Sequence, residues 1–547
     1  MTKAIANLPA YQRAIAKGHL GSCGIKYRDL EKPIIAVVNT WNEIVPGHCH
    51  LRHLAEEVKR GIRASGGQPL EFNTVAICDG IAQGHGGMRY SLPSRELIAD
   101  SVEAMIHGHG IFDGMVLLGS CDKIVPALLM AAARINIPSI VVTGGPMVNQ
   151  IKPWESKAAR QQFLRGEIPE EKLFDATVAY YPSAGVCPFL GTANTMCLIA
   201  EALGMSLSGT AAIPALDKRK EAMAYQSGVA VMRLLEQGIK PRNIMTLPCF
   251  YNAIALVAGI GGSLNSVLHL PAIAHECGLN VTYNDFDRIS RETPLIVRVA
   301  PNSRDYTVAD LAPVGGVPAI MKELLPVMHD GMTVDGKNLY EMIAAAPPAD
   351  GEIIKPFGAP FAPEGGIAVL TGNLAPDGAI VKSSAVPAEL WRFSGPARVF
   401  ETEEECIKAV EDGQVQEGDV IIIRNEGPKG GPGMREMHRT TEVVARFNRV
   451  AVITDGRFSG ASAGLSVGYL SPEAADNGPI AFVEPGDLIE IDIQQRLLNW
   501  HISEEALKQR RDNAGKRSGP DVKSDFLTLY GRNTTSAANG AVRKLNG

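Results

Sequence analysis

The sequence has few aromatic residues, few charged residues and no long apolar run. Phe, Trp and Tyr make up 6% of its 547 residues, and charged residues make up 20%. Acidic residues (59) outnumber basic ones (53), so the chain lacks the basic balance that is typical of nucleic-acid binding. The most apolar helical stretch, residues 124–135, contains Arg134 and is too short to span a bilayer. We therefore expect neither a nucleic-acid partner nor membrane insertion.

Cysteine is also scarce. The nine cysteines are odd in number and widely spaced, and no CxxC pattern occurs, so neither a disulfide framework nor a compact zinc-ribbon or ferredoxin pattern is expected. The first residues are interrupted by Lys3, Arg13 and Lys17, which leaves no apolar stretch of the signal-peptide type. We expect a cytoplasmic protein.

A chain of this length predicts more than one domain. In the first 150 residues, short apolar runs alternate with helical patterns, which is typical of a parallel sheet covered by helices. Ser94 is the expected N-cap of the second helix. The predicted strands are 33–38, 74–77, 114–118 and 137–143, and the predicted helices are 50–65, 94–107 and 125–136.

The second half of the chain has a different pattern. A mainly helical region runs to about residue 325, a stretch rich in Pro, Gly and Ala follows, and short β-like runs with turn signals come after it. These runs are 367–370, 420–423, 450–453, 480–483 and 488–493. We predict an α/β protein with a large N-terminal α/β/α domain with a mainly parallel sheet (1–350), a linker (351–375) and a smaller β-rich, barrel-like domain (376–547).

A Cys-Asp pair occurs twice, each time directly after a predicted strand. The pairs are Cys78-Asp79 and Cys121-Asp122. Ligands bind at the carboxyl ends of strands in open α/β sheets, so we expect two thiols and two carboxylates at one rim. One such pair alone is usually a buried cysteine and a capping aspartate, but two on neighbouring strands favour function. Thiolates suit iron–sulfur clusters or zinc and carboxylates suit Mg²⁺, so two different metal centres are predicted.

Six stretches of the chain closely resemble the family of dihydroxy-acid and sugar-acid dehydratases, nearly from end to end. This resemblance implies an iron–sulfur hydro-lyase that removes water from a small 2,3-dihydroxy carboxylate to give a 2-keto acid. It also implies a homodimer or a dimer of dimers. The stretches are TWNEIVPGHCHLR (40–52), CDGIAQGHGGMRYSLPSRELIADS (78–101), GSCDKIVPALLMAAARINIP (119–138), GTANTM (191–196), GPKGGPGMREM (427–437) and ITDGRFSG (453–460).

For the cluster, the resemblance makes Cys121 and Cys187 ligands. Many members have Pro-Cys-Asn where this chain reads Pro46-Gly47-His48, so one thiol is missing from its usual place. Cys78 and Cys49 are the alternatives for the third ligand, and we favour Cys78 because its predicted position at a strand end matches that of Cys121. A [4Fe-4S] cluster is favoured, with [2Fe-2S] as the alternative.

For the second centre, the resemblance makes Asp79, Asp122 and Glu436 ligands to Mg²⁺. Lys123 completes the site as an N-carboxylated lysine, which removes the difficulty of an ammonium beside a cation. Ser459 is implied to be the catalytic base. A serine hydroxyl is too weak a base by itself, so it would work as an alkoxide favoured by the nearby cation.

Several alternatives stay open from the residues alone. His85 either orients substrate or packs in its loop, and His48 and His50 are either metal ligands or neighbours of the site. Residues 460–464 match the GxSxG motif of serine hydrolases, but only His501 follows as a partner, which disfavours that reading. A non-enzymatic iron–sulfur redox protein would not need three carboxylates and a lysine.

The substrate is also open between two groups of the family. The Ile-Val-Pro-Gly-His stretch and the chain length resemble members of branched-chain amino-acid biosynthesis, which act on 2,3-dihydroxy-isovalerate. The sequence around Cys187, GVCPFLGTANTM, departs from their usual pattern and allows a sugar acid or glycerate.

Overall fold

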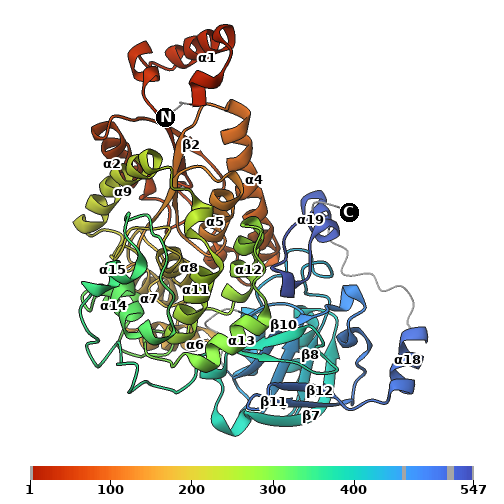
Figure 1. The fold of residues 1–547 in the computed structure, drawn as a ribbon. Coiled ribbons are helices and arrows are strands. Elements are labelled where there is room, and N and C mark those ends of the chain that lie inside the picture. The colour runs from red at the N-terminus through yellow and green to blue at the C-terminus, as the bar shows by residue number, and fades with distance from the viewer. Residues whose placement is uncertain (1–3, 459–463, 514–522, 545–547) are drawn as a thin grey trace.

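The structure is a computed structural model that describes residues 4–458, 464–513 and 523–544. Figure 1 shows two bodies: the N-terminal half forms a helix-rich body around a sheet, and the C-terminal part forms a strand-rich body beside it. The chain is therefore an α/β protein with a β-rich C-terminal region, as predicted. None of the described helices is long and apolar enough to cross a membrane.

The N-terminal sheet has four strands, all parallel, in the order β2-β1-β3-β4. Its inner strands β1 (Ile34–Asn39) and β3 (Gly114–Gly119) and its edge strand β4 (Ser139–Thr143) are buried along their whole length, because helices cover both faces. The other edge strand, β2 (Gln68–Asn73), alternates between buried and partly exposed residues. The prediction of a mainly parallel sheet is confirmed.

The predicted strand at residues 74–77 is wrong. The second strand is β2, and 74–77 form no regular element, so Cys78 follows an irregular segment instead of a strand. Because β2 lies at the edge of the sheet, its sequence QPLEFN is not the continuous apolar run that marks a strand buried on both faces.

The helices of the N-terminal body surround this sheet, and α2 and α9 pack against each other beside it. They are α1 (Ala10–Ser22), α2 (Leu51–Ala64), α3 (Asp79–Ala82), α4 (Ser91–His109), α5 (Ile124–Ile135), α6 (Pro153–Leu164), α7 (Glu170–Tyr180), α8 (Thr192–Ala202), α9 (Lys218–Gln237), α10 (Pro241–Ile244), α11 (Leu247–Ile260), α12 (Ser266–Glu276), α13 (Tyr283–Glu292), α14 (Gly316–Glu323) and α15 (Leu339–Ala344).

The expected N-cap at Ser94 is wrong, because α4 begins at Ser91 with Tyr90 as its N-cap. The hydroxyl of Ser94 donates to the carbonyl oxygen of Ser91, at 2.6 Å, inside the first turn. Pro93 therefore lies inside the first turn of α4 and not before the helix. A proline is tolerated there, because the backbone N–H groups of the first turn have no partner within the helix.

Two glycines allow α2 and α9 to approach closely. A Cβ on Gly61 would lie 2.1 Å from the carbonyl oxygen of Tyr225, and a Cβ on Gly228 would lie 2.2 Å from that of Val58. Backbone atoms cannot move aside as a flexible side chain can, so the two helices would have to separate. The contact therefore requires glycine at both positions.

We expect Gly61→Ala to lower the free energy of unfolding by about 1–3 kcal/mol through this overpacking. Chemical denaturation of the purified protein measures the change. Gly108→Ala, in α4, is the matched control, because no described atom lies within 4 Å of its Cβ position apart from its chain neighbours and the backbone of its own helix. Equal destabilisation by both variants would contradict the close-packing account.

The C-terminal sheet has eight strands in the order β12-β11-β7-β8-β9-β10-β6-β5. A further bridge between Thr371 and Leu497 links its two ends, so the sheet is nearly closed into a barrel, as predicted. The strands are β5 (Ala368–Leu370), β6 (Gly378–Val381), β7 (Arg392–Phe400), β8 (Val420–Ile423), β9 (Ala451–Thr454), β10 (Leu465–Ser471), β11 (Leu488–Asp492) and β12 (Leu497–Trp500). The helices are α16 (Glu403–Glu411), α17 (His438–Val444), α18 (Glu504–Asn513) and α19 (Asp525–Asn533).

The predicted strand at 480–483 is wrong: Pro479–Phe482 form a short 3-10 helix. Pro479 occupies its first position, where the fixed φ of proline suits a helical turn. The run 480–483 resembles a strand in the sequence because its residues are apolar. In the structure, all four residues of the 3-10 helix are buried. Four strands, β6, β7, β10 and β12, were not predicted.

Candidate functional site

Three carboxylates from both halves of the chain meet at the junction of the two bodies. Oxygen atoms of Asp79, Asp122 and Glu436 all lie within 4.8 Å of one another. Asp79 begins α3, Asp122 lies in the turn between β3 and α5, and Glu436 precedes α17 in the C-terminal body. These are the three acidic residues that the sequence analysis named as metal ligands.

Lys123 lies among these carboxylates and is fully buried. Its Nζ donates to Oδ2 of Asp79 at 2.7 Å and lies 3.6 Å from Oδ2 of Asp122. It follows Asp122 directly and is the N-cap residue of α5, so the same turn positions both side chains.

Two further residues complete the group, and the sequence analysis missed both. The Nη1 of Arg457 donates to Oε2 of Glu436 at 2.7 Å and to Oδ1 of Asn265 at 3.1 Å. Its Nη2 lies 3.9 Å from Oδ2 of Asp79 and has no hydrogen-bond partner among the described residues. Asn265 also donates to Glu436, at 3.0 Å. Arg457 stands inside the ITDGRFSG stretch, whereas no motif marks Asn265.

The backbone near Glu436 and Arg457 is held in uncommon conformations. The two residues form an isolated parallel bridge, which sets their side chains side by side. Met434 and Tyr469 have φ values of 42° and 55°, in the left-handed region that only glycine visits readily. The hydroxyl of Tyr469 lies 2.8 Å from Oδ1 of Asn265. Such strain gathers at sites where the surrounding structure fixes one geometry.

The electrostatics of the carboxylates point to a divalent cation. Burial, reinforced by Asp79 and Glu436, raises the pKa of Asp122 to about 7. Burial opposes ionisation of Asp79 as well, but Lys123 and Arg457 outweigh it and lower the pKa of that carboxyl. Three buried carboxylates are therefore only partly neutralised by two cations. Hard oxygen donors crowded in this way fit Mg²⁺.

Three thiols lie close to the same rim. Burial raises the pKa of Cys121 well above its usual value, and the neighbouring Cys78 and Cys187 raise it further. Burial likewise raises the pKa of Cys187 to about 12, with Asp122 and Cys78 adding to the effect. Cys49 is exposed, and its Sγ lies 3.4 Å from the carbonyl oxygen of Pro46. Cys78 is therefore close enough to Cys121 and Cys187 to affect their pKa values, whereas the exposed thiol of Cys49 contacts the backbone of its own loop.

In the described part of the chain, the three sulfurs are not grouped as tightly as the three carboxylates. Ligands of one tetrahedral zinc would lie about 4 Å apart. Cys121, in the turn after β3, has a φ of 65°, a backbone conformation that is uncommon for a residue with a side chain.

Gly47 lies directly beside this group. A Cβ at this position would be 2.8 Å from Sγ of Cys121. The position where many members of the resembling family have a cysteine is therefore next to a thiol of this chain, even though its own thiol is absent.

The three histidines near the site serve the local backbone. His48 is buried, and its ring nitrogens contact Thr40 and, at 2.9 Å, the carbonyl oxygen of Ser120; burial lowers its pKa to about 4. His50 contacts the carbonyl oxygen of Gly144. In His85, Nδ1 accepts from its own loop at Gly87 and Nε2 contacts the carbonyl oxygen of Ile81. These contacts favour packing roles over metal ligation.

Ser459, the predicted base, and the rest of residues 459–463 lie outside the described residues. The described residues on its N-terminal side, Arg457 and Phe458, are fully buried at the carboxylate group or beside it. The carbonyl oxygen of Phe458 lies 2.6 Å from the hydroxyl of Tyr469.

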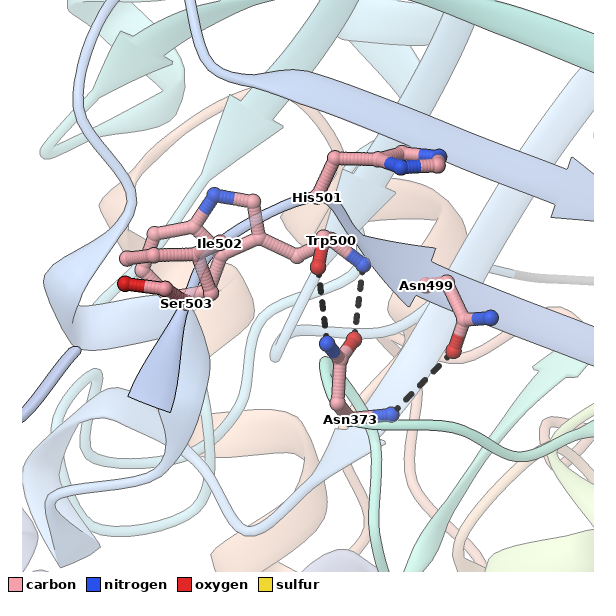
Figure 2. Close-up of a pocket in the computed structure, with 6 residues that line it drawn as sticks. All are labelled: Asn373, Asn499, Trp500, His501, Ile502 and Ser503. Atoms are coloured by element: carbon pink, nitrogen blue, oxygen red, sulfur yellow. Dashed lines mark hydrogen bonds between the residues drawn. The ribbon is translucent and has the colours of Figure 1, made fainter. Parts of the chain in front are cut away.

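A separate, open hollow of about 440 Å³ lies at the C-terminal sheet. Figure 2 shows the residues that line it. The side chain of Asn373 forms two hydrogen bonds with the backbone of Trp500, each of 2.7 Å. The backbone N–H of Asn373 donates to Oδ1 of Asn499 at 3.4 Å. These bonds join residue 373 to β12, where the barrel closes. None of the described ligand candidates lines this hollow, so we interpret it as a structural feature of the closure.

Comparison with known proteins gives matches along almost the whole chain. The dihydroxy-acid/6-phosphogluconate dehydratase family matches with its N-terminal region at residues 32–342 and with its C-terminal region at 352–541. A dihydroxy-acid dehydratase of Caldicellulosiruptor saccharolyticus is 46% identical, over 97% of this chain and 98% of the relative. Proteins of the same name from Methanococcus aeolicus and Pyrococcus abyssi are each 45% identical, over 97% of this chain and 98% of the relative.

Proposed function

Because this chain belongs to the dihydroxy-acid/6-phosphogluconate dehydratase family and is a hydro-lyase, we propose that it converts a 2,3-dihydroxy carboxylate to a 2-keto acid. The favoured substrate is 2,3-dihydroxy-isovalerate, in branched-chain amino-acid biosynthesis, because the relatives named above are dihydroxy-acid dehydratases. A sugar acid or glycerate is the alternative.

One observation carries this proposal: the oxygens of Asp79, Asp122 and Glu436 converge, from both bodies, next to a buried lysine and a group of thiols. Dehydration requires that negative charge be stabilised where a proton leaves and that a poor leaving group, hydroxide, be expelled. A site with hard oxygen donors on one side and soft sulfur donors on the other suits these two tasks.

In this proposal, Cys78, Cys121 and Cys187 hold the iron–sulfur cluster, with [4Fe-4S] favoured over [2Fe-2S]. The three carboxylates hold Mg²⁺ together with Lys123, which is N-carboxylated. When bound, a cluster iron with an open position would act as a Lewis acid on the C3 hydroxyl, and Mg²⁺ would stabilise charge at the carboxylate and C2 hydroxyl.

The residues of the chain supply the proton transfer and the positioning. Ser459 Oγ, as the alkoxide, takes the proton from C2, the electron pair of the C2–H bond forms the C2=C3 double bond, and the C3–O bond breaks. The departing hydroxide takes the proton from Ser459 and leaves as water, which restores the alkoxide. Arg457 and Asn265 hold the carboxylate of Glu436, so that this ligand from the C-terminal body keeps its place beside the two aspartates. The enol that results tautomerises to the keto acid without a further catalytic group.

A keto-acid assay across substrates tests the proposed function. The protein is reconstituted anaerobically and offered 2,3-dihydroxy-isovalerate, glycerate and C5–C6 aldonates at equal concentrations. We expect the highest kcat/KM with 2,3-dihydroxy-isovalerate. A preference for an aldonate would replace the favoured substrate by the alternative, and release of keto acid from none of them would overturn the proposed function.

The third cluster ligand is tested by a pair of cysteine variants. We expect Cys78→Ser to lose most of its iron and sulfide, because its thiol lies with Cys121 and Cys187. Cys49→Ser should keep both, since its thiol is exposed. Iron and sulfide analysis measures the contents, and electron paramagnetic resonance of the wild type identifies the cluster type. Loss of iron in Cys49→Ser alone would reverse the assignment.

We further propose a homodimer or a dimer of dimers in the cytoplasm. A cluster with an open iron position requires a reducing compartment, where thiols stay free.

A further inference from the structure

The buried surroundings of Lys123 contain hydrogen-bond donors that lack an acceptor. His269 is fully buried, and its Nε2 has no hydrogen-bond partner in the part of the chain that the structure describes. The same is true of Nη2 of Arg457, which lies 3.9 Å from Oδ2 of Asp79. Lys123 donates to that same oxygen. A buried donor without a partner is costly, so each of these two needs an explanation.

The contacts of His269 determine which of its nitrogens carries the proton. Nη1 of Arg95 lies 3.3 Å from Nδ1 of His269, and a guanidinium can only donate, so Nδ1 is the acceptor. The guanidinium of Arg95 is itself fixed by Glu96 and by the carbonyl oxygens of Gly540 and Ala541. A neutral imidazole with this contact carries its proton on Nε2, so the nitrogen without a partner is a donor.

His269 lies on α12, and this helix lies at the junction of the two bodies in Figure 1. Asn265, four residues earlier and on the same face of the helix, donates to Glu436. Helix α12 also packs against α5, which begins directly after Lys123. Burial, followed by the charges of Arg95, Lys123 and Arg457, holds the pKa of His269 well below its usual value.

An ammonium on Lys123 does not satisfy these donors, because it offers only donors of its own. A carboxylate on its Nζ supplies two acceptor oxygens at this place. The uncharged amine of Lys123 attacks the carbon of CO₂, an N–C bond forms, one C–O π pair moves onto oxygen, and a proton leaves the nitrogen for solvent. The product is a carbamate, and no oxidant or reductant is needed.

We propose that His269, through Nε2–H, and Arg457, through Nη2–H, are positioning residues that hold the carboxylate of an N-carboxylated Lys123. This inference rests on the proposed function, which includes the modified lysine. It adds two residues that determine whether the modification persists: one from the N-terminal body and one from the C-terminal body. A hydrogen bond to a charged oxygen contributes enough to change the stability of a reversible carbamate by about tenfold.

Two amide variants of His269 separate its two nitrogens. His269→Gln places an amide group near the position of Nε2, and His269→Asn places one near Nδ1, where it still meets Arg95. Both variants keep a polar side chain of moderate size, so a general effect on folding should be similar in the two. Thermal unfolding checks this.

The measurement is the ¹³C resonance of the carbamate in the Mg²⁺-loaded holoenzyme, titrated with ¹³C-labelled bicarbonate at constant pH. The signal is assigned by its absence in Lys123→Arg. We expect His269→Asn to need about ten times more CO₂ than the wild type for half-occupancy, and His269→Gln to need about the same.

Equal CO₂ affinity in the wild type and His269→Asn would overturn the inference, as would an equal loss in both amide variants. Absence of a Lys123-dependent signal in the wild type would overturn it as well. None of these outcomes depends on turnover. If the protein forms keto acid but substitution of His269 does not change its affinity for CO₂, the proposed function holds and this inference fails.

Discussion

Replacing Glu436 by glutamine is expected to weaken binding of the divalent cation on the order of 100-fold, since even a residue that only supports a metal ligand contributes 10–100-fold. The amide keeps the shape of the side chain but removes one anionic oxygen donor of the three that converge. The hydrogen bonds from Arg457 and Asn265 would then meet a neutral oxygen. Mn²⁺ binding, followed by electron paramagnetic resonance and competed by Mg²⁺, measures the change.

Glu404→Gln is the matched control for this variant. Glu404 lines the same small hollow as Glu436, but it is largely exposed and pairs with Arg435. Its substitution also exchanges a carboxylate for an amide at the same hollow, without touching the three converging oxygens. Unchanged Mn²⁺ affinity in Glu436→Gln, or an equal loss in Glu404→Gln, would contradict the metal site.

Replacing Ser459 by alanine is expected to lower keto-acid production about 1,000-fold with the cluster intact, because removal of a positioned general base typically costs 10²–10⁴-fold. The effect should fall on kcat, since the base acts on the proton at C2 and not on the binding of the substrate. Steady-state kinetics with the reconstituted variant, together with its iron content, measure the change.

Ser462→Ala is the control here, because Ser462 is the serine of the GxSxG pattern. We expect this variant to retain activity. Loss of activity in Ser462→Ala together with retention in Ser459→Ala would support the hydrolase-type serine and remove Ser459 from the mechanism. Full activity in Ser459→Ala, whatever the activity of Ser462→Ala, would remove Ser459 from the mechanism without supporting the hydrolase-type serine.

The fold class could be predicted because its signals are local. Strands such as β3 and β4 are covered on both faces and therefore appear as continuous apolar runs. The edge strand β2 lacks that signal, and the prediction moved the strand to the apolar run 74–77 that follows it. The run 480–483 is apolar because it is buried, but Pro479, directly before it, favours a 3-10 turn. Burial and strand geometry are separate properties, and periodicity does not distinguish them over four residues.

The candidate site likewise contains residues that the sequence could predict and residues that it could not. Asp79, Asp122 and Glu436 stand in long motifs, and the structure brings them together. Asn265, at the start of α12, reaches the same place only through the packing of that helix at the junction of the two bodies, and no local pattern marks it or His269, one turn further on. Residues that complete a site through tertiary packing are not visible in a single sequence.

The central claim is that the converging carboxylates form a cation site on which dehydration depends. Its most direct test is keto-acid release from 2,3-dihydroxy-isovalerate as a function of bound Mn²⁺ in the anaerobically reconstituted protein. The account predicts that turnover is absent without the ion, rises in proportion to occupancy and saturates at a single ion per chain. Full turnover by a protein free of divalent cation would contradict it.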